Sequence, residues 1–439
     1  TEIGSNSYWL CIGGKHLILD AGLHPKLEGL AALPDFSPVP EGKVDAIFIT
    51  HAHQDHVGGL PVLTRREPQA RVYMTEQTSR IADVMLHNSV NVMTRQREDD
   101  GITEYPLFTH RGVEFCTQAW NARPVRKRYN LLGESSTDDS EVTFEFFDAG
   151  HILGSAGILF RYKGRTVFYT GDVNFENQTL MKGASFPEEG VDVLIMETTR
   201  GDSPVPTGFS RANEEDRLAR GIRRAFESGG SVTIPVFALG KTQELLAMLW
   251  KMRIHGLLAH VPIYIGGLST KITGIYDALA ASSIRSHPEL QLLHEMAPYV
   301  LSGNEVNTIA PRKKCIFALS SGMIYRKVIG DANQSLFFVG YSDPSSPAGR
   351  IRTAPQNQPV CLEKGTAPIP VRCHIEEFQF SAHANRETLK NYALLLKPGK
   401  VVLVHGDRPA IDWFQLALYK QLPKTEIIVP DPGKRIKLE

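Results

Sequence analysis

A cluster of four potential metal ligands is the feature that most constrains how this chain can fold. His51, His53, Asp55 and His56 lie within six residues, directly after the apolar run 45–50. Histidine offers a transition metal a neutral nitrogen, and aspartate offers a charged oxygen. Residues two apart share one side of an extended segment, so we expect both first histidines to point the same way. The aspartate and last histidine should project from the turn that opens the next helix. A chance group of surface histidines is the alternative, but it rarely follows a buried strand in this form.

Further donors follow other apolar runs of the chain. A catalytic metal keeps an open coordination position, and a two-metal site needs a shared ligand and additional donors. The additional candidates are His151, Asp172 and His405, each shortly after a strand-like run. A single histidine at a strand end is usually a structural residue. Three such ends together with the first cluster indicate one common site.

These segments resemble the metallo-β-lactamase superfamily and, within it, the β-CASP branch of nucleases. Asp20, after Leu17-Ile-Leu, matches the first motif of the superfamily, and the cluster at 51–56 matches the second. His151 and Asp172 match the third and fourth motifs. The resemblance implies an α/β fold, namely a metallo-β-lactamase αββα sandwich with an inserted β-CASP α/β domain.

Three motifs of the β-CASP branch are also matched. They are Glu197 in Ile195-Met-Glu-Thr-Thr, His383 in Phe380-Ser-Ala-His-Ala, and His405. After Glu197 the chain reads Thr-Thr-Arg-Gly where relatives often carry Thr-Tyr-Gly, which is expected to alter the substrate path there. The loops 320–323 and 340–349 are expected either to line an RNA channel or to pack one domain on the other.

The pattern of expected strands and helices changes near residue 202. Short β runs alternate with helical stretches before that point, which is typical of layered α/β structure. Strand–helix–strand units follow it and predict a parallel sheet with crossover helices. We therefore expect the metallo-β-lactamase domain at 1–201, the inserted domain at 202–375, and a return segment at 376–439 that carries the last two motifs.

The resemblance implies two zinc ions, with manganese as the alternative, that activate water and stabilise the charge developing on a phosphate. The expected ligands form two overlapping sets. The first set is His51, His53, His151 and Asp172. The second set is Asp55, His56, His405 and again Asp172. Asp20 is expected to orient a ligating histidine from behind, and a turn carboxylate that caps backbone amides is the alternative.

Asp55, Glu197 and His383 are the catalytic candidates. The resemblance pairs Glu197 with His383, which would protonate the leaving oxygen. A carboxylate partner raises the pKa of a histidine, and a raised pKa suits a general acid. Simple phosphate binding is the alternative for His383, and Ser381 is expected to bind an RNA phosphate beside it.

Two classes of enzyme remain after the ligand motifs are assigned: a nuclease, and a hydrolase of a small substrate such as a thioester or lactam. The motifs alone do not separate them, because a fold does not determine a function. A long insertion suits a polymeric substrate. Within the β-CASP branch, members that act on RNA carry histidine at the position of His405, and members that act on DNA typically carry valine. The resemblance therefore implies a ribonuclease acting on single-stranded RNA, with endonucleolytic and 5′–3′ exonucleolytic modes left open. A DNA nuclease of the same branch is the alternative.

Composition limits the partners and the location. The 48 basic and 48 acidic residues give a formal net charge of zero, which argues against a surface of nonspecific positive charge. A local groove can still be basic, and 123–128 and 312–314 are candidate patches, with solvated loops as the alternative. Five cysteines without a C-x-x-C pair indicate thiols of a reducing compartment. No apolar run reaches the roughly 18 residues of a membrane helix. We expect a cytoplasmic protein that acts as a homodimer or within an RNA-processing complex.

Overall fold

The structure is a computed structural model that describes residues 2–302, 305, 314–319, 324–340, 344, 346–362 and 365–438. The chain divides into two compact units. Unit 1 comprises Thr1–Asn177, Met181–Val205 and Ala382–Glu439, and unit 2 comprises Gln178–Leu180 and Pro206–Ser381. The second unit ends later than the expected 375 because the strand β18 (His374–Glu377) pairs with β15 (Ser335–Phe338) of the same unit.

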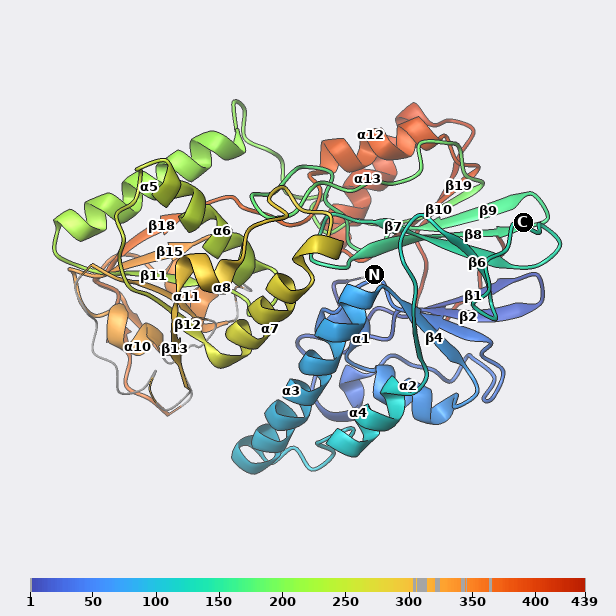
Figure 1. Cartoon of the computed structure of the whole chain (residues 1–439), viewed down its shortest axis with the longest axis horizontal. Helices are drawn as coiled ribbons and strands as arrows, with labels where there is room; N and C mark the ends of the chain where they lie inside the picture. Colours follow the sequence, from blue (N-terminus) through green and yellow to red (C-terminus); the bar gives the residue numbers. More distant parts are fainter. Residues whose placement is uncertain are drawn as a thin grey trace. The chain divides into compact units, whose positions relative to one another are not determined.

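Unit 1 contains a five-stranded sheet in the order β1-β2-β3-β4-β5. Its strands are β1 (Tyr8–Ile12), β2 (Lys15–Leu19), β3 (Ala46–Phe48), β4 (Arg71–Met74) and β5 (Trp120–Ala122). The first pair is antiparallel and the others are parallel. The helices that accompany this sheet are α1 (Gln54–Val57), α2 (Leu60–Arg66), α3 (Glu76–Asp100) and α4 (His110–Thr117), with a short 3-10 turn η1 at Gly29–Ala32 (Figure 1).

A second sheet of unit 1 has seven strands in the order β20-β19-β10-β9-β8-β7-β6. The strands are β6 (Arg128–Asn130), β7 (Thr143–Asp148), β8 (Ala156–Tyr162), β9 (Arg165–Tyr169), β10 (Val193–Glu197), β19 (Lys400–Val404) and β20 (Glu426–Ile428). Strand β10 runs parallel to both β9 and β19, and its last residue, Glu197, is paired with Val404. The return segment therefore completes this sheet and delivers His405 to its edge.

Two apolar layers hold unit 1 together. Phe48, Phe144 and Tyr169 belong to the layer between the two sheets, in which every member is buried. Phe168, the neighbour of Tyr169, points the other way, into a layer shared with α12 (Arg386–Leu396) and α13 (Arg408–Gln421). Side chains alternate across a strand, so one strand serves both layers, and each fully buried large side chain contributes about 1.5–3 kcal/mol. Figure 1 shows α12 and α13 beside β10 and β19, which confirms the expected αββα sandwich.

Unit 2 is built on a six-stranded sheet in the order β13-β12-β14-β11-β15-β18, and all pairings among these strands are parallel. Its further strands are β11 (Val232–Pro235), β12 (Ile263–Gly266), β13 (Tyr299–Leu301) and β14 (Ile316–Leu319), with a small ribbon of β16 (Pro359–Val360) and β17 (Ile369–Pro370). Its helices are α5 (Arg211–Glu227), α6 (Lys241–Ile254), α7 (Gly267–Ala278), α8 (Leu292–Met296), α10 (Tyr325–Val328) and α11 (Pro347–Thr353), with a 3-10 turn η2 at Ala280–Ser282. The parallel sheet predicted from the strand–helix–strand pattern is thus present.

Two expectations from composition can be compared with the described residues. Within these ranges, no helix combines the length and the apolar character that a membrane span requires. All five cysteines lie in described segments and none of them forms a disulfide, and Cys11 and Cys361 are exposed.

Candidate metal centre and active site

Strand ends of both sheets of unit 1 bring the predicted donors together. His51 and His53 follow β3, His53 with an extended backbone, and Asp55 and His56 lie on the short helix α1. The other donors follow β7, β9 and β19, and are His151, Asp172 and His405. All of the seven are buried except His53 and Asp55, which are half-buried. The site therefore depends on four separate segments of the chain.

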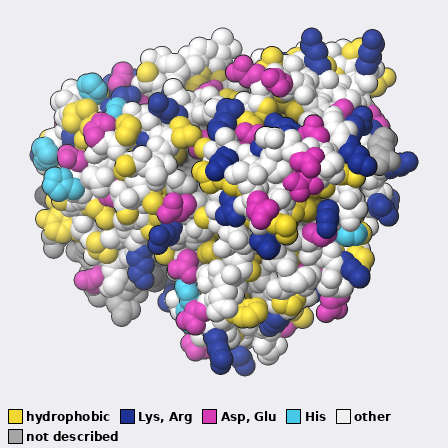
Figure 2. Space-filling model, turned by 45° about the vertical axis from the view of Figure 1, so that its right-hand side comes forward, with side chains coloured by type: hydrophobic (Ala, Val, Ile, Leu, Met, Phe, Trp, Pro, Cys, Tyr) yellow, Lys and Arg dark blue, Asp and Glu magenta, His cyan; other side chains and the backbone are white. Residues whose placement is uncertain are grey.

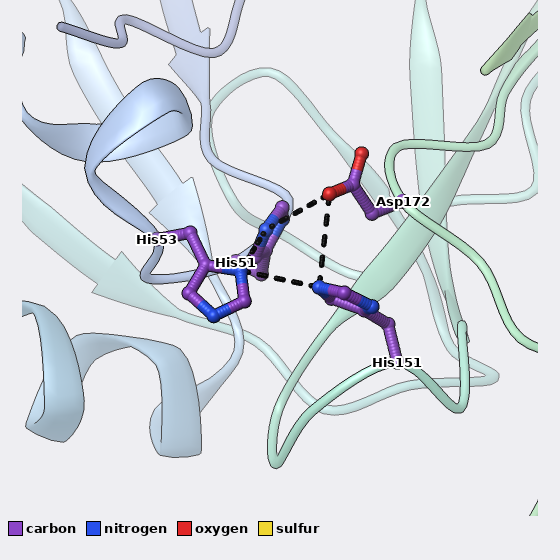
Figure 3. Close-up of side chains that lie close together, drawn as sticks. All are labelled: His51, His53, His151 and Asp172. Carbon is purple, nitrogen blue, oxygen red and sulfur yellow. Dashed lines mark hydrogen bonds and ion pairs between the residues drawn. The ribbon is translucent and has the colours of Figure 1, made fainter. Parts of the chain in front are cut away.

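The first donor set encloses a single point (Figure 3). Nδ1 of His53 lies 3.1 Å from Nε2 of His51 and 3.1 Å from Nε2 of His151. Oδ2 of Asp172 lies 3.5 Å from the first of those Nε2 atoms and 3.6 Å from the second. Ligands of a tetrahedral zinc ion, at about 2.1 Å from the metal, are about 3.4 Å apart. The spacing of these four atoms fits such an ion.

The second donor set shares Asp172 with the first. Oδ2 of Asp55 lies 3.3 Å from Nε2 of His405 and 3.9 Å from Nε2 of His56. Oδ1 of Asp172 lies 3.4 Å from Nε2 of His56, is buried, and accepts no hydrogen bond from any described residue. A buried carboxylate oxygen without a partner is costly. A cation held by this set would satisfy it, so the residues fit two metals with Asp172 between them.

Hydrogen bonds from the far side of the rings determine which nitrogen each histidine offers. Nδ1 of His56 is 2.8 Å from Asp20 Oδ2, and Nδ1 of His151 is 2.8 Å from the carbonyl oxygen of Ala382. Both oxygens can only accept, so Nδ1 carries the hydrogen and Nε2 presents its lone pair. Such bonds orient ligating histidines and make them better donors.

Asp20 lies directly behind the donor His56, as expected for an orienting carboxylate. It also accepts hydrogen bonds from the Thr50 backbone N–H at 2.8 Å and from the Tyr169 hydroxyl at 2.7 Å. Its backbone is left-handed, with φ of 61°, which aspartate tolerates better than most residues. Tyr169 was not predicted as part of the site. Its one indication in the sequence is a hydroxyl at the end of β9, directly after the apolar Val167 and Phe168.

The pKa shifts of the buried donors differ between the two sets. Burial, together with the neighbouring histidines, lowers the pKa of His51 and of His151 well below the ordinary histidine value. Burial alone would raise the pKa of Asp172, but the charges of His405, His56 and His383 hold it well below the ordinary value. Metals bind neutral imidazoles and ionised carboxylates. These directions favour that combination in the first donor set. In the second set burial would lower the pKa of His56 and of His405, but the charge of Asp172 raises both, so a metal bound there would displace a proton from each ring.

Glu197 and His383 form a pair next to the first donor set. Oε2 of Glu197 lies 3.2 Å from Nδ1 of His383, and Oε1 accepts a hydrogen bond from the Val173 backbone N–H at 2.6 Å. The glutamate side chain is 2% exposed and the histidine side chain 23% exposed. Burial would lower the pKa of His383, but the charges of Glu197 and Asp172 raise it above the ordinary value. The histidine can therefore hold a proton at a partly open position.

The backbone around His383 is bound to the same segment as Asp172. The N–H of Ala384 donates to the carbonyl oxygen of Val173 at 2.6 Å. Glu197 holds the N–H of Val173 from the other side, so one glutamate ties the loop of Asp172 to the loop of His383. Val173 and Ala382 act through their backbones, which is why their side-chain types gave no sequence signal.

The remaining predicted residues contribute differently. Ser381 is half-buried at the end of unit 2, and its phosphate-binding role stays a prediction. Within 123–128, Arg123 donates to the Gly133 carbonyl, and Arg126 stacks 4.5 Å from the Phe147 ring centroid. Arg128 pairs with Asp139.

Arg126 and Lys127 are exposed, and Arg123 and Arg128 are half-buried, so these arginines have partners within the protein while the basic patch at 123–128 stays a prediction. Lys/Arg and Asp/Glu side chains are interspersed on the face drawn in Figure 2. The candidate residues 312–313, 320–323, 341–343 and 345 lie outside the described residues.

Comparisons with known proteins agree with this geometry. Residues 1–220 match the family model of the metallo-beta-lactamase superfamily. Residues 368–430 match a model described as a Zn-dependent metallo-hydrolase RNA specificity domain. These residues include the positions of His383 and His405.

Two curated relatives and one solved structure illustrate the similarity. The RNase J-like protein of Methanocaldococcus jannaschii is 27% identical, over 95% of this chain and 93% of that protein. The cleavage and polyadenylation specificity factor subunit 3 of Dictyostelium discoideum is also 27% identical, and this chain spans only 56% of its length. A crystal structure of a protein of unknown function from Enterococcus faecalis V583 has a TM-score of 0.56 at 14% identity, covering 99% of this chain and 97% of that one, and shows the fold alone. The family resemblance drawn from the motifs is confirmed by these matches.

Proposed function

The chain belongs to the metallo-beta-lactamase superfamily, and from that premise we propose that it is a metal-dependent ribonuclease that hydrolyses phosphodiester bonds of single-stranded RNA. One observation carries the proposal most directly. Asp172 directs one oxygen to each of two donor sets, and the Glu197–His383 pair lies at the same carboxylate. Two cations and a proton donor at one point are what cleavage of a phosphodiester requires.

We assign zinc to both donor sets, with manganese as the alternative. The donors are imidazole nitrogens and carboxylate oxygens, and four of the distances between donors of the first set are 3.1–3.6 Å, which suits zinc. When bound, such a pair supplies an acidified water and positive charge for the phosphate. The task of His51, His53 and His151 is to hold one site, and the task of Asp55, His56 and His405 is to hold the other.

His383 is assigned the role of general acid. Its Nδ1–H is directed at the Glu197 carboxylate, which leaves Nε2 to carry a proton to the leaving oxygen of the RNA. Glu197 is itself fixed by the Val173 N–H, so the imidazole keeps its orientation as the proton leaves. Proton transfer by a placed side chain typically accelerates a reaction ~10²–10⁴-fold.

RNA is favoured over the alternative substrates by two features. The match to an RNA specificity domain covers the return segment that contributes His383 and His405 to the site. The name of the Methanocaldococcus relative, which is covered almost over its full length, identifies it as similar to a ribonuclease. The name of the Dictyostelium relative designates it a subunit, which favours an RNA-processing complex over a homodimer as the working assembly.

The test is cleavage of matched single strands. Protein purified without chelator and supplied with zinc is given RNA and DNA of one sequence, labelled at either the 5′ or the 3′ end. We expect cleavage of the RNA at least tenfold faster than of the DNA, and its abolition in an Asp172→Asn control. The two labels distinguish internal cuts from 5′–3′ degradation. Equal rates on DNA would favour the DNA nuclease, and hydrolysis of thioesters or lactams without cleavage of either strand would favour the small-substrate hydrolase.

A further inference from the structure

Thr199 contacts His405, a member of the second donor set, from the segment that follows Glu197, where no residue was predicted to serve the metal site. Its Oγ1 lies 2.9 Å from Nδ1 of His405 and 3.3 Å from the carbonyl oxygen of the same residue. The side chain is half-buried. No sequence motif indicated a role for this hydroxyl, because its partner lies 206 residues further along the chain.

The backbone around His405 is held by the neighbouring threonine. The N–H of Thr198 donates to the His405 carbonyl at 3.1 Å, and its hydroxyl donates to the Val404 carbonyl at 2.9 Å. His405 has a left-handed backbone with φ of 47°. A Cβ at Gly406 would lie 2.2 Å from Oγ1 of Thr198, so the chain passes too close for any larger residue. With the backbone fixed, the rotation of the imidazole is what Thr199 can still influence.

The direction of the two hydrogen bonds follows from the acceptor. A carbonyl oxygen can only accept, so the Thr199 hydroxyl donates its hydrogen to the carbonyl of His405. The hydroxyl oxygen then accepts from Nδ1–H of the ring. Nε2 of His405, 3.3 Å from Oδ2 of Asp55, is then the ring nitrogen that can be offered to a cation.

A competing acceptor lies close to the same ring nitrogen. Oδ1 of Asp172 is 3.2 Å from Nδ1 of His405, yet it receives no hydrogen bond from the described residues. The ring is turned so that its N–H reaches Thr199 instead. If that acceptor were missing, a small rotation would bring the N–H onto the oxygen that Asp172 offers to the second metal.

We propose that Thr199 is a positioning residue that keeps the hydrogen of His405 on Nδ1 and away from Asp172, so that Nε2 of His405 and Oδ1 of Asp172 both remain available to the second metal. The inference rests on the two-metal part of the proposed function and is independent of the RNA substrate. Loss of an outer partner of a metal-ligating histidine typically costs ~10–100-fold in metal affinity. The hydrogen bonds of the Thr199 hydroxyl go to His405 and not to the first donor set, which should keep its affinity.

The test measures zinc binding and the tautomer of His405 in three variants. Thr199→Val removes the acceptor hydroxyl at nearly constant side-chain volume. Thr199→Ala removes the hydroxyl together with the methyl group. Thr199→Ser keeps the hydroxyl and removes only the methyl group. Zinc affinity of each site is determined by chelator competition and calorimetry, and the tautomer by nitrogen chemical shifts of labelled histidine in metal-free protein. We expect both acceptor-free variants to bind the second zinc ~10–100-fold more weakly, to retain the first within about threefold, and to lose the wild-type nitrogen shifts of His405. The serine variant should keep the wild-type zinc affinity of both sites and the wild-type nitrogen shifts of His405.

Thr198→Val is the matched control, because this hydroxyl bonds a backbone carbonyl rather than the ring. It should lower the melting temperature while leaving the second zinc affinity within about threefold. If it weakens that site as much as Thr199→Val does, the position of the loop is responsible and the proposal is wrong. Wild-type zinc affinity together with unchanged His405 shifts in both acceptor-free variants would also overturn it. The shifts are read without zinc or RNA, so they test Thr199 even if the cleavage assay fails.

Discussion

Replacement of Glu197 by glutamine tests the acid role of His383 with little change of shape. The carboxylate has two partners, the Val173 N–H at 2.6 Å and Nδ1 of His383 at 3.2 Å. Glutamine can offer an oxygen to only one of them. The backbone N–H can only donate, so the amide oxygen must face it and the NH₂ group must face the ring. Nδ1 would then have to accept, which is incompatible with a charged imidazole.

The size of the effect follows from the distance. Two unit charges 3.2 Å apart attract by about 5 kcal/mol at an effective dielectric constant of about 20. The loss is smaller in practice, because Asp172 remains 4.0 Å from the same nitrogen and continues to support the charge. We expect Glu197→Gln to slow RNA cleavage ~10–100-fold at pH 7, and His383→Ala, which removes the proton donor altogether, to slow it ~10²–10⁴-fold.

The assay compares two RNAs under single-turnover conditions. One is natural, and the other carries a 3′-phosphorothiolate at the cut bond, where sulfur leaves without needing a proton. Both variants should retain their metal and should recover most of their loss on the sulfur substrate. If His383→Ala loses metal, His383 is a ligand. If the sulfur substrate gives no rescue while metal is retained, His383 is better explained as a phosphate anchor and the reasoning is refuted.

Three further perturbations have expected outcomes. The first is His405→Asn, because valine would strain the left-handed backbone at φ of 47°. This variant should lose most RNA cleavage and the second metal, and the melting temperature of the metal-free protein should stay within a few degrees of wild type. RNA cleavage within a few fold of wild type at saturating zinc would exclude the ligand role of His405. Elemental analysis should find two transition-metal ions per chain, and dialysis against a chelator should abolish cleavage until zinc is returned; an active, folded preparation without such metal would contradict the assignment. Burial raises the pKa of Asp148 from 3.8 to about 7, so the folded chain keeps a proton that the unfolded chain releases, and the free energy of unfolding falls as pH rises through this window. Asp148→Asn should therefore raise the free energy of unfolding by about 1–4 kcal/mol at pH 8 and leave it nearly unchanged at pH 4, as measured by urea unfolding. An equal change in the free energy of unfolding at both pH values would show that ionisation of Asp148 is not the cause.

Local spacing in the sequence determined the part of the site that lies on one segment. His51, His53, Asp55 and His56 follow one strand within six residues, so their side chains must lie close together whatever else the chain does. Asp172 and His151 could be added because the ends of apolar runs are recognisable without a structure. The layered α/β structure and the parallel insertion were predictable for the same reason, since both depend on the order and period of apolar runs, whereas the αββα sandwich was implied by the family resemblance.

Tertiary structure decided how those residues work together. His405 reaches Asp55 across 350 residues only because β19 pairs with β10 in one register, and the carbonyl of Ala382 reaches His151 across 231 residues. Such partners are backbone groups or single hydroxyls, such as that of Thr199, and any residue type can supply a carbonyl. Which nitrogen each histidine offers, and which oxygen of Asp172 faces which donor set, therefore depends on strand register and ring rotation. Neither quantity is encoded in the spacing of residues along the chain, because both arise from contacts between segments that folding alone brings together.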